Sequence, residues 1–220
     1  PTGYFNNMFK FTFNEIRDLI IAFFIISLCF ALLYAGRDSN VVLSILPMVM
    51  VGVGLGFILH ELGHKFTSMR YGYWAEFKLW PQGLILALIT SLFGFVFAAP
   101  GAVYTYGNYI TDEVNGKISV AGPVVNIILA IIFLIVASLV YPNAIHNSAF
   151  GQIFIVCSLG YSINSFLATF NLIPIGNLDG SKVLNWNSGV WIVTIAISGI
   201  MTYASMTMGV ENIVRMLIGF

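Results

Sequence analysis

The residues of this chain best suited to chemistry are His60, Glu61 and His64, which lie in the segment His-Glu-Leu-Gly-His. Residues four apart share one face of a helix, so the two histidines can offer imidazole nitrogens to one tetrahedral metal ion. Glu61 lies beside them as a candidate general base. The spacing therefore predicts a zinc site and the chemistry of metal-assisted hydrolysis.

The membrane setting strengthens this interpretation, because the three residues follow an uncharged run at 41–59. Ionisable groups in a bilayer cost about 2.5–3.5 kcal/mol each on insertion scales, so three of them close together require a compensating function. A single histidine on an apolar face is more often a hydrogen-bonded core residue, but the spacing and the cost together favour metal binding. Gly52 and Gly56 continue the four-residue series and predict a small-residue face that packs against another helix.

The composition indicates the class of protein. The 220 residues are 59% hydrophobic and 8% charged, whereas an ordinary soluble domain is about 25% charged. We therefore predict an all-α polytopic membrane protein, embedded in a lipid bilayer, with five or six transmembrane helices. The formal net charge is zero and no basic block is present, which argues against nucleic acid as a partner. The predicted organisation has three parts: an amino-terminal interfacial segment at 1–18, a membrane-embedded domain at 19–210, and a tail at 211–220. The spans of the membrane-embedded domain are expected at about 19–35, 41–66, 118–141, 149–174 and 188–210.

The distribution of lysine and arginine predicts the orientation, since these residues in short loops mark the cytoplasmic side. With the amino terminus inside, most of them fall on the inner side: Lys10, Arg17, Lys65, Arg70, Lys78, Lys117 and Lys182. Arg37 falls outside, as does Arg215 if the tail is outside. We therefore expect the active site to lie toward the cytoplasmic face. Lys65, directly after His64, is expected to extend its ammonium to the membrane interface.

A third metal ligand is needed, because catalytic zinc sites typically use three protein ligands and a water molecule. Asp179 is the acidic residue that closes a very long membrane run. Pro174 cannot continue a helix, and Gly176 with Gly180 allows the chain to turn back just around Asp179. Non-helical backbone at membrane depth is tolerated where it is buried in protein or lines a wet cavity, as a metal site requires.

Three separated motifs carry a family resemblance. They are the histidine motif at 60–64, the segment Ala121-Gly122-Pro123-Val-Val-Asn126, and Asn171-Leu-Ile-Pro174 followed by Leu178-Asp179-Gly180. In this order the chain resembles the site-2 protease family of intramembrane zinc metalloproteases. The stretch 65–117 leaves no room for the soluble peptide-binding domain that is often inserted in bacterial members of that family.

The resemblance implies that one Zn²⁺ per chain is held by His60, His64 and Asp179, and that Glu61 takes a proton from the attacking water and passes it to the leaving amine. It implies that Asn171 lines the active site and bonds to a substrate strand or to the oxyanion. The expected substrate is a transmembrane or membrane-anchored protein, which must unwind locally to be cleaved. The sequence favours no oligomeric state.

Other readings stay open for the asparagines and for the second motif. Asn171 can equally form a hydrogen bond between helices, which is common in membrane bundles. Asn126 and Asn164 are expected to form such structural polar contacts. Gly122 and Pro123 are expected to shape the start of a helix.

The shared metal site constrains the segment at 79–111. His64 and Asp179 end their runs, so an even number of membrane crossings must separate them. Two spans already do, and Gly94 with Pro100 interrupts the apolar segment between them. We therefore expect 79–111 to be re-entrant or β-like, to return to the cytoplasmic face, and to pack beside the zinc helix where a substrate strand could pair with its backbone.

Two other functions remain possible at the level of the sequence. One is a membrane ion or proton transporter that uses His60, Glu61 and Asp179 as a relay; interrupted apolar segments are common in transporters, but no second histidine motif indicates an internal repeat. The other is a catalytically inactive relative that binds zinc.

Overall fold

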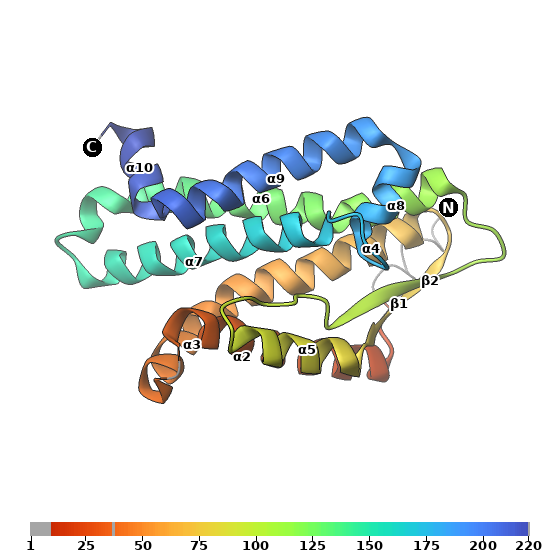
Figure 1. Ribbon diagram of the computed structural model, residues 1–220, viewed down its shortest axis with the longest axis horizontal. Helices are drawn as coiled ribbons and strands as arrows, with labels where there is room; N and C mark the ends of the chain where they lie inside the picture. The colour runs from red at the N-terminus through yellow and green to blue at the C-terminus, as the bar shows by residue number, and fades with distance from the viewer. Residues whose placement is uncertain (1–9, 37, 220) are drawn as a thin grey trace.

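The computed structural model describes residues 10–36 and 38–219 and is mainly helical (Figure 1). Within that part of the chain, five helical segments are long and apolar enough to cross a membrane, and one sheet has two strands. This confirms the predicted fold class. The elements in chain order are α2 (Phe13–Ala35), α3 (Ser39–Val53), the π-helical turn η1 (Gly54–Ile58), α4 (Leu59–Arg70), β1 (Trp74–Leu79), α5 (Pro81–Ser91), β2 (Gly101–Tyr106), α6 (Asp112–Ala144), α7 (Ser148–Asn171), α8 (Asp179–Trp186), α9 (Ser188–Met208) and α10 (Val210–Ile218).

Several helices extend beyond the predicted spans. The side chains of Thr12 and Thr111 accept hydrogen bonds from the backbone of the first turns of α2 and α6, so these helices begin six residues before the apolar runs at 19 and 118. Hydropathy marks the part of a helix that suits a membrane, whereas capping sets its end. Most of the predicted tail, 211–220, is helical and belongs to α10. Residues 1–9 of the expected amino-terminal segment lie outside the described residues.

The helices bring distant parts of the chain to one end of the molecule. The antiparallel helices α6 and α7 run along its length beside α9, and the α3–η1–α4 segment crosses beneath them (Figure 1). The end of α4, the sheet and α8 gather at one end, and α10 lies at the other. The two segments that carry the histidine motif and Asp179 therefore meet, although they are far apart in the sequence.

Small residues let the histidine-bearing segment approach α7. A Cβ atom at Gly52 would lie 3.3 Å from the Cα atom of Gly160, and one at Gly56 would lie 2.8 Å from Oδ1 of Asn164. Neither position has room for a larger side chain without movement of α7. The predicted small-residue packing face is confirmed, and its partner is α7.

The segment between α4 and α6 forms a hairpin that leaves and returns at the same end. Strand β1 pairs with β2 in antiparallel register. Between them α5 lies beside α2 (Figure 1) and is about 16 Å long, which is half the hydrocarbon thickness of a bilayer. The returning chain packs against α7, with ring centroids 5.7 Å apart for Phe95 and Phe166 and 5.2 Å apart for Phe97 and Phe170. Of the five candidate spans, two lie between α4 and α8, namely α6 and α7, which is an even number.

Lys65 does not extend to the membrane interface, contrary to the expectation from sequence. Its side chain is 1% exposed, and its ammonium donates to the carboxylate of Glu15 at 2.7 and 2.9 Å and to the carbonyl of Ala75 at 2.8 Å. An ammonium can be buried where an anion and hydrogen bonds replace water. Helix α2 supplies that anion, and the ion pair ties α2 to α4 and β1.

The same turn of α2 occupies one edge of the sheet. Glu15 accepts a hydrogen bond from the backbone N–H of Phe77 at 3.1 Å, and Asp18 accepts one from Leu79 at 3.0 Å. These carboxylates stand where a third strand would otherwise pair with β1. The opposite edge of the sheet belongs to β2, beside which the described residues contain no further strand.

Candidate active site

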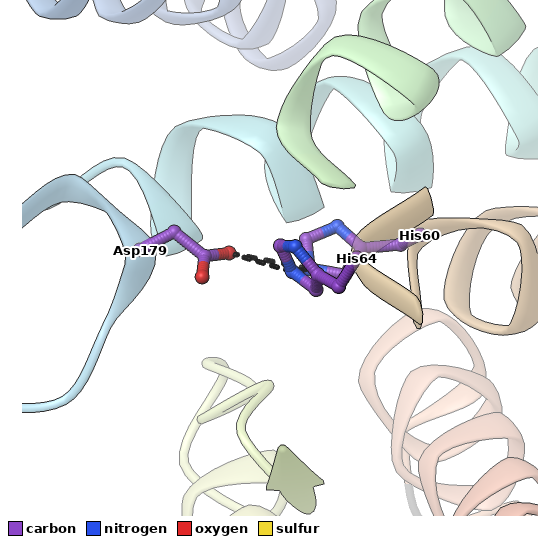
Figure 2. Close-up of side chains that lie close together, drawn as sticks. All are labelled: His60, His64 and Asp179. Atoms are coloured by element: carbon purple, nitrogen blue, oxygen red, sulfur yellow. Dashed lines mark hydrogen bonds and ion pairs between the residues drawn. The ribbon is translucent and has the colours of Figure 1, made fainter. Parts of the chain in front are cut away.

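His60, His64 and Asp179 converge at the end of the molecule that holds the sheet (Figure 2). The two Nε2 atoms are 3.0 Å apart, and Oδ2 of Asp179 lies 3.3 Å from Nε2 of His60 and 3.2 Å from Nε2 of His64. The three residues are 4%, 6% and 9% exposed. Three potential ligand atoms therefore form a small, buried triangle.

The size of this triangle fits a zinc ion. Bonds of about 2.0–2.2 Å in a tetrahedral site place neighbouring ligand atoms about 3.3–3.5 Å apart. The three observed separations, 3.0 to 3.3 Å, are close to that value. Two imidazole nitrogens and one carboxylate oxygen also form a donor set that zinc enzymes use, with a fourth position left for water.

A hydrogen bond from α6 orients His60. Its Nδ1 atom lies 2.6 Å from Oδ1 of Asn126, whose amide group donates to the carbonyl of Gly56 at 3.0 Å and to Oδ1 of Asn164 at 2.9 Å. Because the Asn126 amide nitrogen donates to these two groups, its oxygen accepts a hydrogen bond from the protonated Nδ1 of His60. The Nε2 atom of His60 is then free of hydrogen and directs its lone pair toward Asp179.

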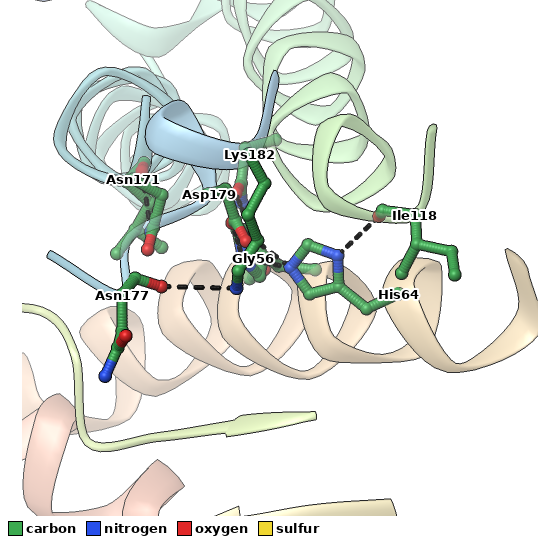
Figure 3. A network of polar contacts seen from close by, with 10 residues as sticks. Gly56, His64, Ile118, Asn171, Asn177, Asp179 and Lys182 are labelled. Carbon is green, nitrogen blue, oxygen red and sulfur yellow. Dashed lines mark hydrogen bonds and ion pairs between the residues drawn. The ribbon is translucent and has the colours of Figure 1, made fainter. Parts of the chain in front are cut away.

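His64 is oriented in the same way by a backbone group. Its Nδ1 atom lies 2.8 Å from the carbonyl oxygen of Ile118, which can only accept a hydrogen bond (Figure 3). Nδ1 therefore carries the proton, and Nε2 faces the triangle. Both histidines are held in the tautomer that a metal ion requires.

The second sequence motif lies inside α6 and not at its start, which corrects the expectation for Gly122 and Pro123. A Cβ atom at Gly122 would lie 2.6 Å from Cε1 and Nε2 of His64 and 2.7 Å from Cε1 of His60. Glycine is thus required for α6 to approach both imidazole rings. Pro123 has no N–H for the carbonyl of Ser119, four residues earlier, so the helix is loosened next to the site.

The loop between α7 and α8 brings Asp179 to the histidines. The carbonyl of Leu172 accepts a hydrogen bond from Nε1 of Trp191 at 2.8 Å, and Gly176 turns the chain with φ of +57°. A Cβ atom at Gly180 would lie 2.0 Å from the Leu172 carbonyl oxygen, so only glycine allows α8 to begin this close to α7. Asp179 is the first residue of α8.

The charge state of Asp179 suits a metal ligand. Burial alone would favour its protonated form, but protonated imidazoles at His64 and His60, through their charge and their hydrogen bonds, would outweigh burial and hold the pKa of Asp179 below its ordinary range. A bound zinc ion between neutral imidazoles would favour the carboxylate in the same way.

Glu61 has an oxygen atom with no partner. The residue is 7% exposed, and its Oε2 atom is buried without a hydrogen bond to any of the described residues. Buried carboxylate oxygens are nearly always satisfied, so this one requires an explanation. Glu61 lines the same cavity as the three candidate ligands, where the oxygen can accept a proton from a water molecule.

All five sequence-predicted site residues line one cavity of about 680 Å³, since Asn171 joins Glu61 and the three candidate ligands there. Residues of β2 and of the loop after α7 also line this cavity. The amide group of Asn171 donates a hydrogen bond of 2.9 Å to the carbonyl of Leu167 in the same helix. This bond lies within α7 and does not join two helices.

Sequence reasoning assigned no chemistry to Asn126, whose hydrogen bond orients His60, or to Lys182, which also lines the cavity. Asn126 and Asn164 each form a structural polar contact, as expected; the structure shows that they bond to one another and that this bond is part of the support for His60. A signal was present for both residues. Asn126 lies one helical turn after Gly122, and Lys182 lies three residues after Asp179, which puts each on the face of its helix that carries the site.

The chain is similar to several curated proteins. One relative is "Putative zinc metalloprotease MJ0611" of Methanocaldococcus jannaschii. The two sequences are 40% identical over 199 residues, which cover 90% of this chain and 97% of the relative. It is 30% identical over 158 residues, 64% of this chain and 69% of the relative, to "Putative zinc metalloprotease YwhC" of Bacillus subtilis.

A mycobacterial protein is also similar. "Putative zinc metalloprotease Rip2" of Mycobacterium tuberculosis is 29% identical over 157 residues, which cover 64% of this chain and 57% of the relative. No family model and no solved structure matches the chain.

Proposed function

This chain belongs to the zinc metalloprotease family of MJ0611 and YwhC, and we propose that it is an intramembrane endopeptidase of the site-2 type. Its substrates are membrane proteins, which it cleaves in or near a transmembrane helix. The observation that carries this proposal is that His60, His64 and Asp179 converge with Glu61 in one cavity at the end of a helix fit to cross a membrane.

The chain's own residues supply the proton transfers. Bound zinc would supply Lewis acidity, which activates a water molecule and polarises the scissile carbonyl. Glu61 accepts a proton as the water oxygen attacks the carbonyl carbon, and then delivers that proton to the leaving amine. Asn171, at the edge of the cavity, has an amide hydrogen left over from its bond to Leu167 and can donate it to the substrate backbone.

The sheet offers a binding site for an unwound substrate. Peptide bonds of an intact helix are hydrogen-bonded within the helix, so a substrate must be extended where it is cut. Residues of β2 line the cavity, and the outer edge of this strand has no neighbouring strand among the described residues. The outer edge of β1 is occupied by Glu15 and Asp18. A substrate strand therefore adds to β2, directly opposite the metal ligands.

The active site faces the cytoplasm in this proposal. Of the nine lysines and arginines, seven belong to segments at the end of the molecule that carries the site: Lys10, Arg17, Lys65, Arg70, Lys78, Lys117 and Lys182. Arg215 lies on α10 at the opposite end, and Arg37 is outside the described residues. An excess of basic residues at one end is the feature that orients membrane proteins toward the cytoplasm.

The decisive experiment compares wild type with Glu61→Gln. Both proteins are reconstituted in liposomes with single-span peptides whose helices contain a glycine or proline, and zinc content and cleavage are measured together. Glu61→Gln should keep its zinc and lose roughly 10²–10⁴-fold in turnover, because it retains the shape of the site without the base. Glu113→Gln, an exposed glutamate paired with Lys117 on the surface, is the matched control and should cleave normally.

The rival functions give different results in the same preparation. If the protein is an ion or proton transporter, a pH or ion gradient should dissipate across wild-type liposomes and no peptide should be cleaved. An inactive relative predicts one zinc per chain, no cleavage and no flux. Normal cleavage by Glu61→Gln would rule out Glu61 as the base.

A further inference from the structure

Helix α8 brings a second functional group into the cavity besides Asp179. Lys182 follows Asp179 by three residues, close to one helical turn, and its side chain extends past Asp179 toward the histidine-bearing helix (Figure 3). It lines the same cavity as Glu61 and the candidate metal ligands. Among the described residues that line this cavity, Lys182 is the one lysine or arginine.

The ammonium of Lys182 is held in place but not saturated. Its Nζ atom donates a long hydrogen bond, 3.3 Å, to the carbonyl oxygen of Asn177 (Figure 3). An ammonium has three hydrogens to donate, so two remain for a ligand in the cavity. The bond to Asn177 places the ammonium beside the loop that leads to Asp179.

The charge balance of the cavity gives Lys182 a role in the reaction. Asp179 lines the space in which hydrolysis would generate a negatively charged oxygen, and so does Glu61, which is negative until it accepts the water proton. Bound zinc would offset the charge of Asp179, and the ammonium of Lys182 is the cationic side chain beside the same space. Asn171 is neutral and already spends one amide hydrogen on Leu167. Hydrogen bonds from a charged donor are roughly twice as strong as neutral ones, so Lys182 is the better partner for an oxyanion.

We propose that Lys182 is a catalytic residue that donates a hydrogen bond to the substrate carbonyl oxygen as negative charge develops on it. The proposal rests on the proteolytic function above. As the water oxygen bonds to the carbonyl carbon, the π electrons of the carbonyl move onto its oxygen, and Glu61 takes the water proton. When the carbon–nitrogen bond breaks, its electron pair leaves with the nitrogen, which receives that proton, and the carbonyl re-forms. Lys182 keeps its own proton throughout.

The test compares Lys182→Met, which keeps the length of the side chain without its charge, with Lys182→Arg. Lys117→Met is the matched control, because Lys117 lies at the same end of the molecule in an exposed ion pair outside the cavity. Loss of one oxyanion donor typically lowers kcat by roughly 10²–10³-fold. We expect a fall of this size for Lys182→Met with KM little changed and zinc content unchanged, substantial recovery in Lys182→Arg, and normal kcat in the control.

A binding measurement tests Lys182 independently of turnover. A phosphinic peptide mimics the negatively charged reaction centre, and a reduced-amide peptide of the same sequence has no such oxygen. Lys182→Met should weaken binding of the phosphinic peptide by the same factor as kcat and leave binding of the reduced-amide peptide unchanged. Equal affinity of wild type and Lys182→Met for the phosphinic peptide would overturn the proposal.

Two further outcomes are distinguishable. Loss of zinc or of the fold in Lys182→Met, without recovery in Lys182→Arg, would mean that the residue only supports the Asp179 loop, and would also overturn the proposal. Absence of peptide cleavage by wild type would count against the proteolytic function, whereas the ratio of the two peptide affinities would still report whether Lys182 binds the anion.

Discussion

Substitution of Gly122 by alanine should weaken zinc binding more than it weakens the fold. The added Cβ atom would lie 2.6 Å from Cε1 and Nε2 of His64 and 2.7 Å from Cε1 of His60, whereas ordinary van der Waals contact begins at 3.4 Å. At least one ring must therefore move by about 0.8 Å, the difference between 3.4 and 2.6 Å. Metal-ligand distances tolerate only about 0.2 Å.

The expected magnitude follows from this displacement. Disturbing the groups that orient a metal ligand typically lowers metal affinity 10–100-fold, and moving the ligand itself should reach at least the upper part of that range, about 100-fold. The added methyl group costs about 1–3 kcal/mol through overpacking, but replacing a helix-interior glycine by alanine returns about 1 kcal/mol. The net loss of stability is small, because without metal the rings can turn away from the new methyl group.

The assay is a competition for zinc between the purified protein and a coloured chelator, combined with thermal unfolding in excess chelator. Gly199→Ala is the matched control, since Gly199 lies in α9 and a Cβ atom there would meet no heavy atom within 4 Å. That variant should bind zinc normally and gain up to about 1 kcal/mol in stability. Unchanged zinc affinity in Gly122→Ala would refute the inference that α6 fixes the position of both imidazoles.

Three further predictions follow from the contacts around the site. Asn126→Ala removes the acceptor that orients His60 and should lower zinc affinity roughly 10–100-fold in the same competition assay; an affinity within twofold of wild type would contradict this role. Glu15→Gln leaves the buried ammonium of Lys65 without its anion and should destabilise the protein by about 3–5 kcal/mol. Adding Lys65→Met to the same chain should recover most of this loss in a thermal unfolding measurement. If the double variant is no more stable than Glu15→Gln, Glu15 acts mainly through the backbone of β1. Cysteines introduced at Gln82, in the first turn of α5, and at Asn108, just after β2, should react with a membrane-impermeant reagent from the same side, and opposite-side labelling would be incompatible with one metal site shared by α4 and α8.

The parts of the site that the sequence predicted are those that depend on local spacing. His60, Glu61 and His64 lie within one and a half turns of a helix, so helical geometry alone brings them together. Asp179 was predicted because a proline and two glycines end the helical run before and around it, and because the motif resembles that of a known family. In both cases a few neighbouring residues contained the information.

The parts that the sequence did not predict depend on partners that are distant along the chain. The carboxylate that buries Lys65 comes from Glu15, 50 residues earlier, and the amide that orients His60 comes from Asn126, 66 residues later. A sequence indicates that a buried polar group needs a partner, but only the packing of helices decides which one it finds. For this reason the expectation that Lys65 extends to the membrane interface was wrong, and the role of Asn126 was missed.

Hydrolysis within a membrane protein imposes two opposing requirements, since metal ligands are best fixed in dry, packed surroundings and the reaction consumes water. The two sides of this cavity divide these requirements. On one side, His60 and His64 are almost fully buried and are each bonded to α6, so packed helices set their geometry. On the other side, the wall consists of β2 and the loop that precedes Asp179, which lie at the end of the molecule where most of its basic residues gather. A site at the end of the bundle can therefore combine ligands that are fixed by packed helices with access to water.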